Sequence, residues 1–547
     1  MNRPMNRTRL ILGKAKRLAM VLTAAFLIIP APGARASLEE AFRHPPDSAK
    51  PWAYWFWING NISKAGITAD LEAMAHVGIG GVLIMEVANP KTMAPAGQVA
   101  FASAEWRDMF KHVVAEAGRL GLKVNMNNDA GWCGSGGPWM TPELSMQKLV
   151  ATNVSVTGPQ VFDGTLPQPA ALHDYYRDIK VLAFPAPVRG EQASVPKEKI
   201  LDLTDYMDAA GRLKWDAPPG RWRVMRIGCT TTGALNKPSP LSGQGLECDK
   251  FNPEAITRHF EAFIAKLADD VGPQVGKVFT STHIDSWEVG SQNWTPRMAE
   301  EFRARRGYDL IPWLINVVAP GTSVASAEET QRFRQDYKRT SADLNNEAYA
   351  GALRKLAHRR GLQLSIEAYG TAGFLDPLTY GSEADVPMAE FWIKRWDAWH
   401  LLSPRLTASV AHVHGKPIAG AESFTSTADR DAFTEHPYSV KTTGDWAFCE
   451  GINRFVFHRN VLQPWTNLAP GMSFAGYGWH VDRGQTWWQP GAAFMQYVAR
   501  CQAMLQQGQF VADVCRVVPE GENYGKAPAI ASLPDQYDSI APGYGYD

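Results

Sequence analysis

The sequence predicts an α/β fold, a (β/α)8 barrel of the TIM type with a β-rich domain inserted after the third barrel strand. Three observations predict it: eight short apolar runs, amphipathic helices between most of these runs, and a repeated unit of helix, glycine and strand. Continuous apolar runs are typical of parallel strands that are buried on both faces. Eight such strands with helical crossovers are what a barrel contains. A doubly wound sheet is the alternative, but no Gly-x-Gly-x-x-Gly turn supports it.

The predicted barrel strands are short apolar segments separated by longer amphipathic ones. In chain order they are Trp52–Trp57, Gly81–Met85, Lys123–Met126, Val278–Ile284, Leu362–Ile366, Met388–Trp392, Pro417–Ala421 and Arg454–Phe457. Helices are expected between them at Lys64–Val77, Ala104–Leu120 and Pro296–Arg306. Each helix follows a hydroxyl residue that can accept a hydrogen bond from a free backbone N–H of the first turn. These residues are Ser63, Ser103 and Thr295.

Glycine marks the turn from helix to strand. The unit of helix, glycine and strand recurs at Gly78, Gly121, Gly361 and Gly415. A glycine just after a helix takes the left-handed conformation that turns the chain back toward the next strand. Repetition of this unit is what a barrel of alternating strands and helices requires.

One stretch interrupts the alternation of strands and helices. From about Val150 to Gly245 the chain has no helical periodicity, but it has β-rich runs and many prolines and glycines. Pro218-Pro219-Gly220 lies between two of these runs and predicts a hairpin turn. We therefore expect a barrel formed by residues 37–149 and 246–510, an inserted β-domain at 150–245, and the start of a truncated C-terminal region at 511–547.

The first 36 residues are predicted to be a secretory signal peptide. They carry seven basic and no acidic side chains, an apolar stretch from Leu18 to Ala31, and the small-residue site Ala34-Arg35-Ala36. This order is that of an export signal. A membrane-spanning helix needs about 20 apolar residues, and no later segment offers them. We therefore expect an exported protein, periplasmic or extracellular, with no membrane span after signal removal.

Composition excludes some classes of partner. Without the signal peptide the chain has 48 basic and 55 acidic side chains, a net charge of −7. Nucleic acid is then a poor partner, because binding it requires a basic surface that neutralises phosphates. Six cysteines are scattered without a Cys-x-x-Cys pair, which argues against a structural zinc site and against a disulfide scaffold.

In a barrel, the residues at the carboxyl ends of the strands form the active site. Carboxylates, amides and aromatic residues dominate these positions, which include Trp57, Asn59, Glu86, Asn127, Asn128, Asp129, Asp285, Glu288, Glu367, Tyr369, Glu390, Glu422 and His458. Cleavage of a glycosidic bond requires one carboxylic acid that protonates the leaving oxygen and an opposing carboxylate. Aromatic faces pack on the C–H surfaces of sugars, and amides bond their hydroxyls. The pattern therefore indicates a glycosidase.

Position at a strand end favours Glu288 and Glu422 as the catalytic pair. For Asp285, Glu367 and Glu390, a structural role in an ion pair is an equal alternative, because a site with many acids also needs structural partners. For any single tryptophan at these ends, packing in the core is the better interpretation.

Two other motifs compete as functional sites. His412-x-His414 could bind a catalytic metal, but it lies in a helix-to-strand turn at the opposite face of the barrel. Gly134-Ser135-Gly136-Gly137 could cradle an anion, but no Lys-Ser/Thr follows it, so we expect it to shape the rim of the site. No EF-hand loop is present. The sequence therefore assigns no metal ligands, and it predicts no organic cofactor.

Several long aromatic-rich strings resemble one family of glycosidases. They are Pro51–Gly60 (PWAYWFWING), Gly131–Trp139 (GWCGSGGPW), Asp285–Glu288 (DSWE), Glu422–Thr425 (ESFT) and Gly451–His458 (GINRFVFH). These strings resemble glycoside hydrolase family 106, the α-L-rhamnosidases. The likeness runs from about residue 50 to the end of the chain, and strings of this length are far more specific than a lone pair of acids.

The resemblance implies a (β/α)8 catalytic domain with appended β-domains, and hydrolysis of terminal α-L-rhamnose with inversion. It implies that Glu288 is the general acid, that Glu422 is the general base that activates water, and that Asp285 orients or tunes the acid. Some members depend on calcium, which would suit Asn127–Asp129 without identifying the ligands. The C-terminal β-domains of the family are expected to be missing from this chain.

We therefore predict an exported α-L-rhamnosidase that acts on rhamnose-containing glycosides or polysaccharides by an inverting mechanism. The predicted catalytic residues are Glu288, Glu422 and Asp285. Contacts with the substrate are predicted for Trp57, Asn59, Asn127, Asn128, Asp129, Trp132, Glu367, Tyr369 and His458. Two alternatives stay open, a non-catalytic carbohydrate-binding barrel and a glycosidase of another specificity, because function belongs to the site and not to the fold.

Overall fold

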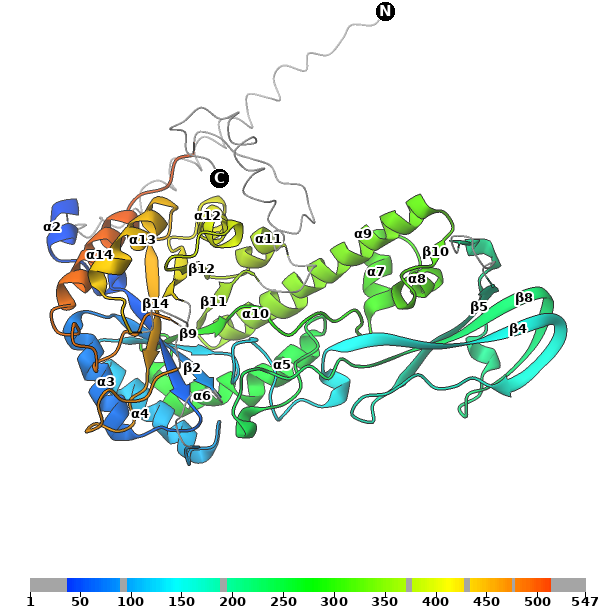
Figure 1. The fold of residues 1–547 in the computed structure, drawn as a ribbon, viewed down its shortest axis with the longest axis horizontal. Helices are drawn as coiled ribbons and strands as arrows, with labels where there is room; N and C mark the ends of the chain where they lie inside the picture. Colours follow the sequence, from blue (N-terminus) through cyan, green and yellow to red (C-terminus); the bar gives the residue numbers. More distant parts are fainter. Residues whose placement is uncertain are drawn as a thin grey trace, which may run out of the picture.

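The computed structural model describes residues 37–88, 96–186, 194–369, 376–426, 433–474 and 478–512. The predicted signal peptide and all but two residues of the region 511–547 lie outside these ranges. The described residues form a closed parallel barrel and an arm of antiparallel strands that projects from it (Figure 1).

Eight parallel strands close the barrel. In chain order they are β1 (Trp52–Ile58), β2 (Gly81–Val87), β3 (Lys123–Asn127), β9 (Phe279–Ile284), β11 (Gln363–Glu367), β12 (Val386–Trp392), β13 (Gly420–Thr425) and β14 (Arg454–Val461). Each strand pairs with the one before it and the one after it in this order, and β14 pairs with β1 to close the sheet. The TIM-type barrel predicted from the eight apolar runs is confirmed.

Helices surround the closed sheet, and some of them extend toward the arm (Figure 1). They are α2 (Leu38–Arg43), α3 (Lys64–Val77), α4 (Ala104–Leu120), α5 (Pro253–Ala262), α6 (Ile264–Val271), α7 (Met298–Arg306), α8 (Leu314–Val318), α9 (Ala327–Leu344), α10 (Gly351–Arg359), α11 (Pro377–Ser382), α12 (Ala398–Val413), α13 (Pro437–Cys449) and α14 (Ala492–Leu505). Among the described helices, none has both the length and the apolar character that crossing a membrane would need.

Two of the predicted helix starts are confirmed and the third is wrong. Ser63 and Ser103 each accept a hydrogen bond from a backbone N–H of the first turn, at 3.0 and 3.1 Å. The hydroxyl of Thr295 instead donates to the buried Asp249 at 2.7 Å. Because that hydroxyl is engaged by a carboxylate, it caps no helix, and α7 begins later, at Met298.

The glycines after α3 and α4 have the predicted conformation. Gly78 and Gly121 have φ angles of 98° and 76°, in the left-handed region. Each ends its helix and leads directly into the next barrel strand. The helix–glycine–strand unit is therefore the device that returns the chain to the sheet.

The alternation of side chains along β1 divides the interior into two layers. Tyr54 and Phe56 point into the barrel, whereas Trp55 and Trp57 point outward into the layer between the sheet and the helices. The ring centroid of Trp57 lies 5.5 Å from that of Trp106 in α4. The inner layer is the one that opens at the carboxyl ends of the strands, so residues in that register line the active site.

The seventh barrel strand begins later than predicted. The prediction of Pro417 as its first residue is wrong, because β13 runs from Gly420 to Thr425. Proline has no N–H for the strand ladder, and the Pro417 carbonyl instead accepts from the side chain of Asn453 at 3.0 Å. The later start places Glu422 inside the strand, opposite Glu390 of β12.

An antiparallel sheet is inserted between β3 and β9. Its strands are β4 (Gln147–Thr165), β5 (Arg177–Pro185), β7 (Leu201–Asp202) and β8 (Arg212–Thr231), in the order β4-β8-β5-β7. Two short strands, β6 (Ser194–Val195) and β10 (Ser323–Val324), pair with each other and connect the insert to the segment before α9. The predicted β-rich insert after the third barrel strand is confirmed.

The predicted hairpin turn at Pro218-Pro219-Gly220 is wrong. Strand β8 runs through these residues and pairs with β4 on both sides of them. The pairing shifts register between Gly158 and Gln160 of β4. Because proline donates no ladder hydrogen bond, these residues form an irregularity within a long strand, and the strand continues past it.

Candidate active site

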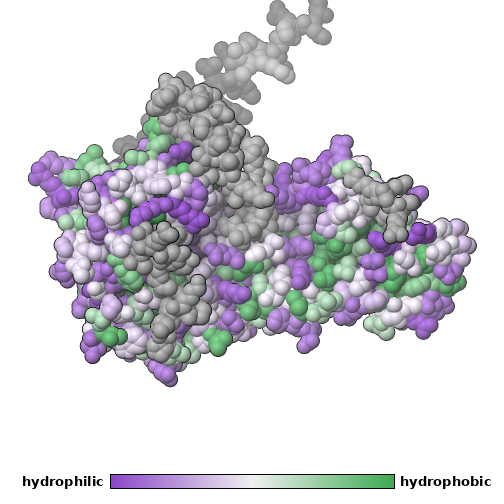
Figure 2. Space-filling view, viewed as in Figure 1, coloured by the Kyte–Doolittle hydropathy of each residue, from purple (hydrophilic) through white to green (hydrophobic). Residues whose placement is uncertain are grey.

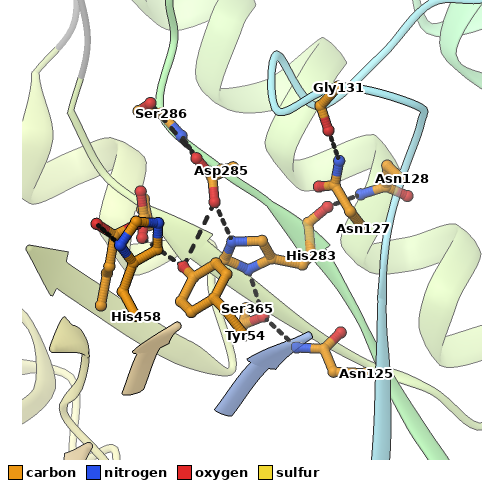
Figure 3. A network of polar contacts seen from close by, with 12 residues as sticks. Tyr54, Asn125, Asn127, Asn128, Gly131, His283, Asp285, Ser286, Ser365 and His458 are labelled. Atoms are coloured by element: carbon orange, nitrogen blue, oxygen red, sulfur yellow. Dashed lines mark hydrogen bonds and ion pairs between the residues drawn. The ribbon is translucent and has the colours of Figure 1, made fainter. Parts of the chain in front are cut away.

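A network of polar contacts joins β1, β9 and β11 in the inner layer of the barrel (Figure 3). Tyr54 Oη donates to Glu367 Oε1 at 2.6 Å and lies 3.4 Å from Asp285 Oδ2. His283 Nε2 lies 3.1 Å from the same Asp285 oxygen, and its Nδ1 lies 2.8 Å from Ser365 Oγ. All five side chains are buried, so each holds its neighbours in place in a medium of low dielectric constant.

Four carboxyl groups gather at this end of the barrel: Asp285, Glu367, Glu390 and Glu422. Burial, and then the carboxylates of Asp285 and Glu422, raise the pKa of Glu367 well above its usual range. Burial raises the pKa of Glu390 to about 7, against the hydrogen bond from the Trp392 indole, which lowers it. Because several like charges cannot all be ionised in one buried cluster, the site holds protons near neutral pH.

Glu288 lies at the edge of this cluster and is exposed. Its Oε1 accepts from Ser286 Oγ at 3.0 Å, and its Oε2 accepts from Trp132 Nε1 at 2.9 Å. The backbone N–H of Ser286 also donates to Asp285 Oδ1, at 2.9 Å. A carboxyl group that is reachable from solvent and held by two donors is suited to exchange a proton with a bound molecule.

Glu422 comes from a different part of the barrel wall, because β11 and β12 separate β13 from β9. It is buried, accepts a hydrogen bond from Thr425 Oγ1, and has its Oε1 3.8 Å from His458 Nδ1. Burial, and then the carboxylates of Glu390 and Asp285, raise the pKa of Glu422 well above its usual range. Burial lowers the pKa of His458 well below its own, so a neutral imidazole faces Glu422.

Asn127, Asn128 and Asp129 form a buried turn after β3. Asn127 Nδ2 donates to the Gly131 carbonyl at 2.8 Å, and Asn128 Nδ2 donates to the His283 carbonyl at 2.6 Å (Figure 3). Asp129 Oδ1 accepts from Asn127 Nδ2 at 3.0 Å. Asn128 therefore ties this turn to β9, and Asn127 holds Asp129 and the loop that follows the turn.

Two residues predicted to contact the substrate lie apart from the network. Trp57 packs in the outer layer, against Trp106 of α4, because the pleat of β1 turns it away from the barrel interior. Asn59 lies in the turn after β1, where it is half-buried and has a left-handed φ of 54°. An asparagine tolerates this conformation better than most residues.

Tyr369 and His458 do share the site. Tyr369 Oη donates to Glu367 Oε2 at 2.5 Å. The ring of His458 meets that of Tyr54 edge-on, with 5.6 Å between the centroids. Each oxygen of Glu367 thus accepts from a tyrosine hydroxyl, and these tyrosines line the inner layer beside the carboxyl cluster.

Three residues at the centre of the network are not among the predicted site residues: Tyr54, His283 and Ser365. The predicted residues were selected at the ends of strands, whereas these three lie inside β1, β9 and β11. The alternation of a strand could have identified His283, because it points to the same face as Asp285 two residues later. Tyr54 lies in an aromatic run that is indistinguishable from core in the sequence.

The described residues contain one group that could hold a metal ion. The potential ligand atoms of His283, Asp285 and Glu367 all lie within 4.8 Å of one another. Calcium prefers roughly six to eight oxygen ligands, so the imidazole of His283 fits it poorly. Two carboxylates and an imidazole are closer to the donor set of a transition metal. Asn127–Asp129, which the calcium-dependent members of the family suggested, do not belong to this group.

The His412-x-His414 pair lies where α12 ends, before β13 begins. The ring of His412 stacks on Phe510, with 4.0 Å between the centroids. This turn is at the face where the strands start, so the pair does not reach the active site.

Comparison with known proteins agrees with this geometry. The sequence model of glycoside hydrolase family 106, described as alpha-L-rhamnosidase, matches residues 43–184 and 174–547. A solved structure, that of a rhamnosidase from Novosphingobium sp. PP1Y, is 29% identical and superposes with a TM-score of 0.80. The superposition covers 88% of this chain and 62% of that chain.

A curated relative from Formosa agariphila, provisionally named as a beta-glucuronidase, is 40% identical over 537 residues. The match covers 93% of this chain and 44% of the relative, so the chain spans less than half the length of that protein. The family match extends over most of the chain and includes the segments that carry Glu288 and Glu422. The chain belongs to glycoside hydrolase family 106.

Proposed function

We propose that the chain is an α-L-rhamnosidase that hydrolyses terminal α-L-rhamnosyl linkages with inversion. The observation that carries this proposal is the placement of two carboxyl groups at one end of the barrel. Glu288 lies in the loop after β9 and Glu422 lies in β13, and β11 and β12 separate these two strands. Hydrolysis with inversion needs such a pair, one carboxyl group on each side of the scissile bond. The description of the matching family and the identity of the solved structure support rhamnose as the sugar.

In this proposal Glu288 is the general acid. It protonates the glycosidic oxygen while the bond from that oxygen to C1 breaks, and the leaving alcohol departs neutral. The Trp132 indole and the Ser286 hydroxyl hold the carboxyl group in place. Because a hydroxyl can rotate, Ser286 can also accept a hydrogen bond from the protonated acid. Asp285 orients the acid through its bond to the Ser286 N–H.

Glu422 is the general base. It takes a proton from a water molecule whose oxygen attacks C1 from the face opposite the leaving group, which inverts the configuration. A base must be ionised to act, and the pKa of Glu422 lies well above its usual range. The proposal therefore expects activity to rise with pH along the acidic limb of the profile. Tyr369 and His458 line the same space and are suited to bond sugar hydroxyls.

The test is rhamnose release from an aryl α-L-rhamnoside by residues 37–547, with product stereochemistry followed by NMR. The wild type is expected to form the β-anomer of rhamnose first. Glu422→Gln should lower kcat by roughly 10²–10⁴-fold, the contribution of a general base. Glu72→Gln, which changes a partly exposed glutamate on α3 that pairs with Arg119, is the matched control and should leave kcat unchanged.

An aryl β-glucuronide is assayed in parallel, because the 40% identical relative is provisionally named as a beta-glucuronidase. Turnover of the glucuronide without turnover of the rhamnoside would contradict the proposed specificity. A folded chain that binds rhamnose and hydrolyses neither substrate would favour a non-catalytic carbohydrate-binding barrel. Formation of the α-anomer first would contradict inversion and the role of Glu422.

We also propose that the protein is exported, on the strength of the basic, apolar and small-residue order of residues 1–36. Expression of the full chain in a Gram-negative host is expected to yield a periplasmic or secreted protein whose N-terminus is Ser37. Recovery of the uncleaved chain from the cytoplasm alone would contradict export.

A further inference from the structure

A buried lysine contacts two loops that border the proposed active site. The side chain of Lys250, in the segment that leads from the insert to α5, is fully buried. Its Nζ donates to Glu247 Oε2 and to Ser135 Oγ, both at 2.5 Å. Ser135 Oγ in turn donates to Glu247 Oε2 at 2.9 Å. A buried ammonium is costly unless it is paired and hydrogen-bonded, and no step of the proposed mechanism uses this one.

Two carboxyl groups face this single ammonium, those of Asp129 and Glu247, and both are fully buried. Burial, and then the carboxylate of Glu247, raise the pKa of Asp129 well above its usual range, whereas Lys250 and the Gly134 N–H lower it. Burial also raises the pKa of Glu247, again against Lys250. Loss of the ammonium would therefore remove the positive charge that favours the ionised form of both buried carboxyl groups.

The first loop that contacts Lys250 follows β3, and we name residues 130–137 the tryptophan loop. It carries Trp132, whose indole N–H donates to Glu288 Oε2 at 2.9 Å, and Ser135, which bonds Lys250. The loop packs closely on its surroundings at Gly134. A Cβ atom added there would lie only 2.6 Å from Tyr349 Oη, so the position has no room for a side chain.

The second loop carries the acid itself, and we name residues 286–290 the acid loop. Lys250 Nζ lies 5.0 Å from the centre of the Trp287 ring, and 5.0 Å from that of Tyr349. An ammonium over an aromatic face is attracted to it. Trp287 directly precedes Glu288, so one ammonium contacts both loops whose side chains meet in the hydrogen bond between Trp132 and Glu288.

We propose that Lys250, with Glu247 and Ser135, is the positioning group of the general acid. It holds the tryptophan loop and the acid loop at the spacing that lets Trp132 and Ser286 orient the carboxyl group of Glu288. The proposal rests on the proposed function, because it concerns the proton that Glu288 gives to the leaving group. Lys250 is fully buried, so it acts through Trp287 and Ser135.

A loss of positioning at the acid has a specific chemical signature. A leaving group that is stable as an anion departs without a proton, whereas a poor leaving group needs one in the transition state. Attack by water at Glu422 is the same for both. A variant with a displaced acid should therefore lose activity in proportion to the basicity of the leaving group, while general damage to the fold lowers turnover of both substrates equally.

The experiment compares Lys250→Met with the wild type on 2,4-dinitrophenyl and phenyl α-L-rhamnosides. For the variant, kcat/KM should fall about 10²-fold or more on the phenyl substrate and no more than about threefold on the dinitrophenyl substrate, the scale of lost general-acid catalysis. Glu288→Gln should show the same split. An equal loss on both substrates, or no loss on either, overturns the proposal.

The control is Arg483→Met, which breaks an ion pair between the half-buried Arg483 and the buried Asp70, at 2.7 Å. It should change turnover of both substrates by one common factor. If Lys250→Met is not folded by circular dichroism, Ser135→Ala replaces it, since it cuts the link to the tryptophan loop and keeps the ion pair. If the wild type hydrolyses neither substrate, both the proposed function and the role of Lys250 are overturned. If the wild type is active and the variant loses activity equally on both substrates, only the role of Lys250 is overturned.

Discussion

At the scale of single residues, the main feature of the proposed site is a cluster of carboxyl groups that are largely removed from water and raise one another's pKa. Glu422 and Glu390 are register partners on neighbouring strands, so their carboxyl groups share one buried environment. Burial is the first cause of the raised pKa of each, and neighbouring carboxylates add to it. The pH at which the base of such a site becomes ionised therefore depends first on its burial and then on the neighbouring carboxylates.

Glu390→Gln is expected to move the acidic limb of the kcat/KM profile to lower pH. The carboxylate of Glu390 raises the pKa of Glu422, so its removal lowers that pKa and lets the base ionise in more acidic solution. The expected shift is about one pH unit, the size of one neighbouring charge. Glu383→Gln, at a glutamate paired with Arg354, is the control and should leave the profile unchanged. A limb that stays in place or moves upward would contradict the coupling.

At the scale of elements, the pleat of each strand decides which residues reach the site. Glu86 stands near the end of β2, but it points outward, and its Oε2 accepts from Trp106 Nε1 of α4 at 3.1 Å. Burial raises its pKa to about 8, although the Trp106 hydrogen bond opposes the shift. A carboxyl group at a strand end can therefore belong to the layer between strand and helix instead of to the mouth of the barrel.

Glu86→Gln is expected to stabilise the protein at pH 8 and to have little effect near pH 5. The unfolded chain releases the Glu86 proton near pH 4.5, while the folded chain keeps it until about pH 8. Between these values the wild type loses stability as pH rises, by up to about 1.4 kcal/mol per pH unit. Glutamine has no proton to release and avoids this loss. Urea unfolding at both pH values checks it, and an equal effect at both would contradict the raised pKa.

At the scale of the whole molecule, the arm formed by the insert has an apolar core of its own. Nine buried residues form it, among them Val156, Val181, Leu213 and Trp215. The rings of Trp215 and Trp222 meet edge-on at 5.5 Å between centroids. Figure 2 shows apolar residues at the surface in patches along the arm. Val161 of β4 and Tyr206 of the insert are both exposed. The arm therefore has stabilising contacts that do not pass through the barrel.

Trp215→Ala is expected to destabilise the arm and to leave rhamnoside turnover unchanged. Truncation of a buried tryptophan costs about 3–5 kcal/mol, and here the lost contacts lie in the core of the insert. Hydrogen exchange should rise in β4, β5 and β8 and stay unchanged in the barrel strands. Trp57→Ala, in the main core, is the comparison and should raise exchange in the barrel. Equal exchange in both parts after Trp215→Ala would contradict an independent core.

The sequence by itself determined the local elements and their order. Local sequence patterns predicted the eight strands and the insert. These patterns are apolar residues repeating every two or 3.6 positions, helix caps such as Ser63, and glycines after helices such as Gly78. The aromatic-rich strings, which include Asp285–Glu288 and Glu422–Thr425, identified the family, and the family match confirms it.

Only the tertiary structure decided which residues share a site. Tyr54 and Glu367 lie 313 positions apart and form a hydrogen bond of 2.6 Å, and Lys250 reaches Ser135 across 115 positions. These contacts depend on the closure and register of the barrel and on which pleat face each residue takes. The same pleat turns Trp57 and Glu86 out of the barrel. The physical reason is that secondary structure is encoded by near neighbours, whereas the gathering of buried charges depends on how the whole sheet closes.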